Sequence, residues 1–255
     1  MTQLLKHELS NTVPEILALG VGGNSAWFQH YLTHSLESLQ HQVNVCTWLK
    51  CMHNGKCESF ADIGSAPFAL PYVLKKYDIF SDVSAFDIDP SRFDNIDKFS
   101  FKIEAVDIEK DIEVSRNFDI IYFSHIFEHL RTDLILTMNN LKSLMDQESL
   151  LYIETPNGLG LKTLRNVLAK GVTTGCASDL YEEWSKIHLF GHMGHVREYG
   201  KGELLSFFDN LDLRVEATGY SGVIPPVTVP KAIASTIQKI CPSLKNDVYF
   251  VLSKK

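Results

Sequence analysis

The 255-residue chain is 45% apolar and 22% charged, which is typical of a globular protein and excludes the disordered and fibrous classes. Its 24 basic and 31 acidic residues give a net charge of −7, so neither an extended nucleic-acid interface nor an anionic membrane surface is expected. A small molecule is the better expectation for a partner.

The amino-terminal segment carries no recognisable targeting signature. Glu8 and Glu15 fall within it, and no basic flank precedes an apolar core. No stretch approaches the roughly 18 apolar residues that an integral membrane segment needs. The five cysteines are odd in number and lack the two-residue spacing of zinc and redox sites. We therefore predict a soluble, cytoplasmic protein with reduced thiols.

Residues 1–58 are predicted to form a helical extension, because apolar residues between Ser25 and His53 recur at helical spacing. Residues 16–19 are the one segment of this extension that suits a strand instead. From residue 60 the pattern changes to seven short apolar runs separated by amphipathic stretches. The runs are SFADIG, SAFDID, FKIEAVD, FDIIYFS, LLYIET, LRVEATG and DVYFVLS. This alternation predicts an α/β domain over residues 59–255, with a doubly wound, mostly parallel, seven-stranded sheet.

Two helices are predicted between these runs, at 71–77 and 132–145. In the second, four apolar residues recur at spacings of four, three and four, which places them on one face, and we interpret them as core. They are Leu134, Met138, Leu141 and Met145. Residues 157–200 and 222–245 fit neither pattern cleanly. We predict that these two insertions cover a site at the carboxyl edge of the sheet.

Two glycine-containing turns, at 17–25 and 60–70, compete for a nucleotide-binding role. A glycine-rich turn alone is a weak signal. A nucleotide site in an α/β fold also needs an acidic residue at the end of the next strand, where it accepts hydrogen bonds from the ribose hydroxyls. Asp87 stands at such a strand end, 25 residues after Asp62. The second turn is therefore preferred, and the first is interpreted as a loop that opens a helix.

The order of these segments resembles that of the class I S-adenosylmethionine-dependent methyltransferases, from about Phe60 to Gly219, with the last strand extending the match to Lys255. Five stretches carry the resemblance. They are AspIleGlySerAlaPro at 62–67, PheAspIleAspPro at 86–90, ValAspIleGluLys at 106–110, the stretch 118–130 that ends in GluHisLeu, and LeuLeuTyrIleGluThrProAsn at 150–157. The resemblance implies a Rossmann-like methyltransferase fold, and the GluHisLeu ending implies the small-molecule or sugar type.

The resemblance also implies a site for S-adenosylmethionine and its product S-adenosylhomocysteine. Asp62 would orient the turn or reach the ammonium group of the ligand, and Gly64 would let the backbone approach the methionine moiety. Asp87 would hold the ribose, Ile88 would lie against the adenine, and Asp107 would accept a hydrogen bond from the adenine amino group. The other cofactor-binding residues implied are Ser65, Ala66, Ile108, Ser124 and His125. Among these, Ser124 would offer backbone oxygen near the ammonium group.

The turn departs from the family pattern, because Ala66 and Phe68 stand where the family has two further glycines. Phe68 is large and sterically confined where glycine would be free. This departure keeps open the alternative of a catalytically inactive, methyltransferase-fold binding or regulatory protein. A nicotinamide-dependent dehydrogenase is a third interpretation, but it lacks a full GxGxxG after the first sheet strand.

Histidines follow the fourth predicted strand and recur near residue 190. Methyl transfer to a hydroxyl requires removal of a proton, and the ordinary pKa of histidine, about 6.5, suits that step. We predict His125, His129 and His195 as catalytic residues, with capping or packing roles as the open alternative. Glu128, between the first two, resembles a family residue of structural importance.

A second group of histidines, His188, His192 and His195, has spacings of four and three, which would suit a metal face on a helix. Gly191 and Gly194 disfavour a regular helix there. Substrate contact and a structural role are both preferred over metal binding, and we predict no metal.

Substrate contacts are predicted in the insertions and just after the fifth strand, where acceptor sites lie in this fold class. The residues are Asn157, Tyr181, Trp184, His188, His192, Arg197 and Tyr199. Together these features predict a methyltransferase that acts on a hydroxyl, or secondarily an amine, of a small molecule or a sugar-type glycan precursor. The sequence also allows for a homodimer.

Overall fold

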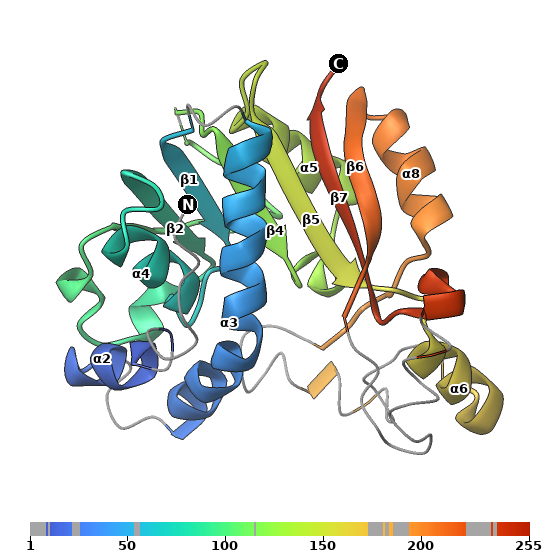
Figure 1. The fold of residues 1–255 in the computed structure, drawn as a ribbon, viewed down its shortest axis with the longest axis horizontal. Coiled ribbons are helices and arrows are strands. Elements are labelled where there is room, and N and C mark those ends of the chain that lie inside the picture. The colour runs from blue at the N-terminus through green and yellow to red at the C-terminus, as the bar shows by residue number, and fades with distance from the viewer. Residues whose placement is uncertain are drawn as a thin grey trace. The chain divides into compact units, whose positions relative to one another are not determined.

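The computed structural model describes residues 9, 11–21, 26–53, 57–114, 116–172, 181, 184–185, 194–222, 236 and 239–255 (Figure 1). Seven strands form one sheet in the order β3-β2-β1-β4-β5-β7-β6. The strands are β1 Ser59–Ile63, β2 Asp82–Asp87, β3 Lys102–Ala105, β4 Ile120–Ser124, β5 Leu150–Pro156, β6 Leu213–Ser221 and β7 Asp247–Lys254. Each predicted apolar run forms one strand, so the predicted doubly wound α/β fold is confirmed.

The strand directions place the ends of β1 and β2 at one edge of the sheet. β1 is parallel to β2 and to β4, and β2 is parallel to β3, whereas β7 runs antiparallel to both β5 and β6. In the register of β1 and β2, Ile63 is paired with Phe86. Gly64 and Asp87, which come next in each segment, therefore stand beside each other at the carboxyl edge.

The chain divides into two compact units. The first unit consists of Met1–Tyr122 and Asn139–Leu150, and the second of Phe123–Met138 and Leu151–Lys255. The helices of the first unit are α2 Thr12–Ala18, α3 Ala26–Met52, α4 Ala69–Lys76 and the short 3-10 turns Pro90–Arg92 and Ile96–Lys98.

The predicted helical extension forms α2 and α3, which pack on α4. Glu15 of α2 links two of these helices, because its carboxylate accepts a hydrogen bond from Tyr72 at 3.1 Å and pairs with Lys76 at 2.6 Å. Residues 16–19, the alternative strand, belong instead to α2 and the turn that ends it. The described part of the first glycine-containing turn, residues 19–21, thus follows a helix, whereas the preferred turn follows β1.

Phe68 occupies the turn between β1 and α4 in a left-handed conformation, with φ +67° and ψ +15°. Only glycine adopts this region without steric cost. The ring is fully buried and meets the rings of Phe93 and Phe99 edge-on, with centroids 5.5 and 6.0 Å away. The chain therefore keeps a backbone conformation that suits glycine, and the buried ring offsets its cost.

Replacing Phe68 with glycine should lower the free energy of unfolding by about 2 to 4 kcal/mol. Loss of a buried phenylalanine ring costs about 3 to 5 kcal/mol, and relief of the left-handed backbone returns about 1 kcal/mol. Urea denaturation measures the difference. Asp78→Gly is the matched control, because Asp78 is exposed at φ +51° and should gain up to about 1 kcal/mol. A stabilised Phe68→Gly protein would show that backbone strain outweighs packing.

The helices of the second unit flank β5, β6 and β7 in sequence. They are the 3-10 turns Phe127–His129 and Pro242–Leu244 and the helices α6 Leu161–Lys170 and α8 Lys201–Asp209. α8 contacts β6, which follows it in the chain (Figure 1). Phe127 anchors the first 3-10 turn, because its ring packs edge-on against Tyr199 at 5.3 Å and Phe208 at 6.3 Å. This packing holds the residues after β4 against the segment that leads into α8.

The predicted helix at 132–145 forms α5, Leu134–Ser143. Met138 and Leu141 of α5 are buried, as is Met145 just after the helix, which confirms the interpretation of these three residues as core. Among the described helices, none combines the length and the apolar composition that crossing a lipid bilayer requires.

Candidate functional site

Three acidic residues lie at the carboxyl ends of adjacent parallel strands in the first unit. Asp62 is the next-to-last residue of β1, Asp87 ends β2, and Asp107 follows β3 by two residues. The turn after β1 is tied to β2, because the N–H of Gly64 donates to the carbonyl oxygen of Phe86 at 2.8 Å. The strand order thus gathers the three carboxylates at one edge of the sheet.

The Asp87 carboxylate joins the two loops at this edge. Its Oδ2 accepts the N–H of Ala66 at 3.0 Å, and its Oδ1 accepts the N–H of Asp89 at 3.3 Å. Gly64 has φ +71°, a conformation that suits its lack of a side chain. Asp87 therefore lies against the turn that carries Gly64, which the nucleotide-binding interpretation requires.

Asp62 is buried with only 6% of its surface exposed. The pKa of Asp62 is raised to about 7, mainly by burial, and the charge of Asp87 adds to the rise. The hydrogen bond that Ser65 Oγ donates to Asp62 at 2.7 Å acts in the opposite direction. A carboxyl group buried at a strand end and titrating near neutrality is typical of a functional site.

The remaining predicted residues of the first unit lie around the ends of β2 and β3. Ile88 is a large apolar side chain that is 41% exposed, whereas Ile108 is buried. Asp107 pairs with Lys110 at 2.9 Å and accepts the N–H of Glu109 at 3.1 Å. Ile88 is thus exposed and the Asp107 carboxylate is partly buried, and their contact with adenine stays a prediction.

In the second unit, Ser124 ends β4 and His125 follows it, beside the buried carboxylate of Glu154. Ser124 Oγ donates to Glu154 Oε2 at 3.3 Å, and the backbone N–H of His125 donates to the carbonyl oxygen of Glu154 at 2.7 Å. His125 has φ +56°, so the chain turns sharply directly after the strand. Ser221 of β6 donates a hydrogen bond to Glu154 as well.

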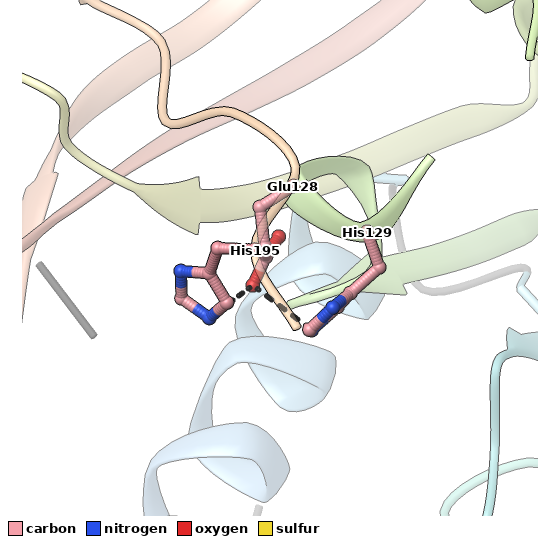
Figure 2. A group of neighbouring side chains, drawn as sticks. All are labelled: Glu128, His129 and His195. Carbon is pink, nitrogen blue, oxygen red and sulfur yellow. Dashed lines mark ion pairs between the residues drawn. The ribbon is translucent and has the colours of Figure 1, made fainter. Parts of the chain in front are cut away.

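Glu128 lies at the centre of three imidazoles. Its side chain is 1% exposed, and Oε1 lies 3.6 Å from His125 Nδ1. The same oxygen lies 3.9 Å from His129 Nε2 and 4.0 Å from His195 Nε2 (Figure 2). Oε2 accepts the hydroxyl of Thr155 at 3.0 Å. The predicted catalytic histidines are therefore brought together, around a glutamate that resembles a family residue of structural importance.

The Glu128 carboxylate and the His125 imidazole shift each other's pKa. Burial alone would raise the pKa of Glu128, but His125, His129 and His195 hold it below its ordinary value. Burial lowers the pKa of His125, and the Glu128 carboxylate, with further contributions from Glu154 and Asp247, outweighs this and raises it to about 9. Glu128 is thus ionised in the folded protein.

The other two imidazoles are oriented through their Nδ1 atoms. His129 Nδ1 donates to the carbonyl oxygen of Gly194 at 3.1 Å, and His195 Nδ1 donates to Glu198 Oε1 at 3.0 Å. The N–H of Val196 donates to the Glu128 carbonyl oxygen at 2.7 Å, which fixes His195 beside Glu128. One potential ligand atom from each of Glu128, His129 and His195 lies within 4.8 Å of the others.

A cavity of about 250 Å³ lies beside this group, within the second unit. Its wall includes His125 and His195, and charged and polar side chains make up much of the rest. The other lining residues are Pro156, Gly160, Lys162, Thr163, Glu198, Asn246 and Asp247. The pKa of Asp247 is raised to about 6, mainly by burial. The charge of His125 opposes this rise, and the charges of Glu154 and Glu128 add to it.

No protein-family profile and no curated protein sequence matches the chain. Solved methyltransferase structures do match it. The plantazolicin methyltransferase BamL, solved with a triazolic desmethylPZN analog and SAH, is 15% identical, with 98% of each chain covered and a TM-score of 0.57. An S-adenosylmethionine-dependent methyltransferase from Clostridium acetobutylicum is 10% identical over 88% of this chain and 98% of that one, with a TM-score of 0.55. Magnesium protoporphyrin IX methyltransferase from Synechocystis, solved with SAH, is 13% identical over 85% and 83%, with a TM-score of 0.52.

The chain has the class I methyltransferase fold. At such low identities the likeness concerns the fold alone, so the residues of the site carry the argument about function. In this methyltransferase fold, the carboxyl edge with Asp62, Asp87 and Asp107 corresponds to the ligand edge of an open α/β sheet.

The predicted substrate-contact residues differ in their burial and in their contacts. Asn157 is buried, and its amide donates to the carbonyl oxygens of Ser243 and Lys245 at 2.8 and 2.9 Å, so it braces the loop before β7. Arg197 pairs with Glu203 of α8 at 2.5 Å and lies over the ring of Tyr199. Tyr181 and Trp184 are 82% and 52% exposed. His188 and His192 lie outside the described residues.

Several residues that the structure places at the cavity or the histidines of the second unit were not predicted from the sequence. Glu198 orients His195 and also accepts the hydroxyl of Thr163 at 2.8 Å. Lys162 and Asp247 line the cavity. Glu198 stands in the stretch HisValArgGluTyr, so its acidic side chain three residues after His195 was an available signal. Asp247 is the first residue of β7, and no local sequence pattern indicates that it lines a cavity.

Proposed function

We propose that the protein is an S-adenosylmethionine-dependent methyltransferase that acts on a hydroxyl, or secondarily an amine, of a small molecule or sugar-type glycan precursor. One observation carries this proposal: Asp62, Asp87 and Asp107 lie at or just after the carboxyl ends of three adjacent parallel strands of a class I methyltransferase fold, with Asp87 against the turn that carries Gly64. A cytoplasmic location and a homodimer stay predictions from the sequence.

The donor would bind at the carboxyl edge of the first unit. An ionised carboxylate has about four acceptor positions, so Asp87 can hold the ribose hydroxyls and still accept the N–H of Ala66. Ile88 offers an exposed apolar surface for the adenine ring. Asp62 would compensate the ammonium charge of the donor. Ser65, Ala66 and Ile108 are the further donor contacts proposed in this unit. The donor contacts of Ser124 and His125, which belong to the second unit, stay predictions from the sequence.

The acceptor would bind in the cavity of the second unit. Its volume of about 250 Å³ lies just below the roughly 300 to 1,000 Å³ of pockets for drug-sized ligands, which favours a small acceptor. Lys162, Glu198 and Asp247 can donate to or accept from several hydroxyl groups.

Methyl transfer is an in-line displacement, in which the acceptor oxygen forms a bond to the methyl carbon while the carbon–sulfur bond breaks. The sulfonium becomes a neutral thioether, and the acceptor hydroxyl must lose its proton. His195 borders the cavity and is the imidazole proposed to take this proton near neutral pH. His125 also borders the cavity, but its pKa is raised to about 9, so it is proposed to take a proton only at higher pH. His129 is the third predicted catalytic residue.

Calorimetric titration with S-adenosylmethionine and S-adenosylhomocysteine tests the donor site, and we expect dissociation constants tighter than about 1 mM. Transfer of a radiolabelled methyl group across a panel of sugars, polar alcohols and amines then tests turnover. Failure to bind either compound would refute the enzyme assignment. Tight binding without transfer to any acceptor of the panel would support the alternative of an inactive binding protein.

A further inference from the structure

The second unit holds a cluster of one carboxylate and two imidazoles, from Glu128, His129 and His195, which we name the Glu-His cluster (Figure 2). The two histidines come from separate segments, one from the 3-10 turn after β4 and one from the segment before α8. Figure 2 shows both rings beside the Glu128 carboxylate, with the two ion pairs converging on it. Two imidazoles and a carboxylate form the ligand set of many transition-metal sites.

The hydrogen bonds of the imidazoles select the tautomer that a metal requires. A carbonyl oxygen and a carboxylate can only accept, so His129 and His195 each donate from Nδ1, to Gly194 and Glu198 respectively. In a neutral ring whose Nδ1 carries the proton, Nε2 carries the lone pair. Both Nε2 atoms face Glu128 Oε1, at 3.9 and 4.0 Å. The bonds to Glu198 and Gly194 match the outer-shell contacts that orient metal-binding histidines.

The Glu128 carboxylate is also oriented so that one oxygen faces the two imidazoles. Glu128 is buried, and the hydroxyl of Thr155 donates to Oε2, which leaves Oε1 as the oxygen that faces the imidazoles. A buried negative charge is costly unless a cation compensates it, and His125 already supplies part of this compensation to Glu128. A divalent ion between Glu128 and the other two imidazoles would add to it and would use the two Nε2 lone pairs at the same time.

We propose that the Glu-His cluster binds one divalent transition-metal ion of the zinc type, through Glu128 Oε1 and the Nε2 atoms of His129 and His195. With metal–ligand bonds of about 2.1 Å, tetrahedral ligands lie about 3.4 Å apart. The 3.9 and 4.0 Å separations therefore need to shorten by about half an ångström, which side-chain rotation provides. Three protein ligands leave a coordination position for water or a substrate atom.

The ion would also change how the cavity is used. His195 lines the cavity as well as belonging to the cluster, so an oxygen atom of a bound molecule could complete the coordination. With His129 and His195 bound to metal, His125 would be the remaining imidazole of the cavity wall. This consequence rests on the proposed function, whereas metal binding itself does not depend on methyl transfer.

Metal binding is tested on the full chain, after treatment with a chelator and without any methyl donor. Calorimetric titration with Zn²⁺ should show one ion per chain, and Co²⁺ should give the visible absorption of a nitrogen- and oxygen-ligated ion. His129→Gln and His195→Gln should each weaken Zn²⁺ binding about 100-fold or more, and Glu198→Gln, which removes no ligand, about 10- to 100-fold.

His41→Gln is the matched control, because it removes an exposed histidine of α3 and should leave Zn²⁺ affinity unchanged. Circular dichroism establishes that each variant is folded, and a poorly folded His129→Gln leaves His195→Gln and Glu198→Gln to decide. Absence of stoichiometric Zn²⁺ binding to the wild type, or equal binding by the wild type and His195→Gln, would overturn the inference. Binding of S-adenosylmethionine is measured in a separate titration. That titration tests the methyltransferase proposal independently of the Zn²⁺ result.

Discussion

Replacing Asp62 with asparagine should make the protein more stable than the wild type at pH 8, by about 2 to 4 kcal/mol. The pKa of Asp62 rises from 3.8 to about 7 because the carboxyl group is buried. Each pKa unit of difference between the folded and the unfolded chain changes the free energy of unfolding by up to about 1.4 kcal/mol. Asparagine has the same shape without the charge, and its side-chain oxygen can still accept the hydroxyl of Ser65.

The stability difference between Asp62→Asn and the wild type should depend on pH. Between about pH 4 and pH 7 the unfolded chain has lost the Asp62 proton while the folded protein retains it, so wild-type stability falls as the pH rises through this window. The advantage of Asp62→Asn should therefore grow by about 2 to 3 kcal/mol between pH 5 and pH 8, as urea denaturation would measure. Asp94→Asn, which removes an exposed carboxylate of the first unit, should show little change at either pH. A pH-independent difference for Asp62→Asn would contradict the explanation by burial.

The same variant should bind S-adenosylmethionine more weakly, if Asp62 compensates the donor's ammonium group. In the wild type, donor affinity should increase as the pH rises through about 7, because the carboxyl group must ionise to pair with the cation. A residue whose removal stabilises the fold and weakens the ligand is retained for function rather than for stability.

Asp87→Ala should weaken binding of S-adenosylhomocysteine by about 10- to 100-fold, equivalent to roughly 1 to 3 kcal/mol. The substitution removes the charged acceptor proposed for the ribose, and it also leaves the N–H of Ala66 without this partner. Calorimetry measures the affinity. Asp89→Ala, two residues further on, removes a half-exposed carboxylate that contacts Ser91 and Arg92, and it should leave donor affinity nearly unchanged.

A deoxyribose analogue separates contact with the ligand from damage to the turn. The 2′-deoxy form of S-adenosylhomocysteine should bind the wild type more weakly than the parent compound, because one hydrogen bond to Asp87 is lost. Asp87→Ala should bind both compounds equally. A variant that still prefers the parent compound would show that another group holds the ribose, and Asp87 would then be important only for the loop.

Much of the fold could be predicted from local pattern. The seven apolar runs became seven strands because buried strands need short continuous apolar segments. Met138 and Leu141 are buried together because residues three apart share a helix face. Asp62 and Asp87 could be paired in advance because parallel neighbours end at the same edge. In each case the signal lies within a few residues of the structure it specifies.

The Phe68 turn shows where local pattern misleads. Its sequence breaks the expected glycine pattern, yet the backbone still adopts the left-handed conformation. The compensation comes from Phe93 and Phe99, which follow in the chain after β2 and are invisible to any inspection of the turn itself.

The sequence by itself determined the strands, the acidic residues that end them, and the presence of histidines after the fourth strand. Only the tertiary structure decided that β7 lies between β5 and β6, that His195 meets Glu128 although the two are far apart in the chain, and that Asp247 lines a cavity. The physical reason is that periodicity reports which face of an element is buried, whereas partners distant in the chain are chosen by how whole elements pack.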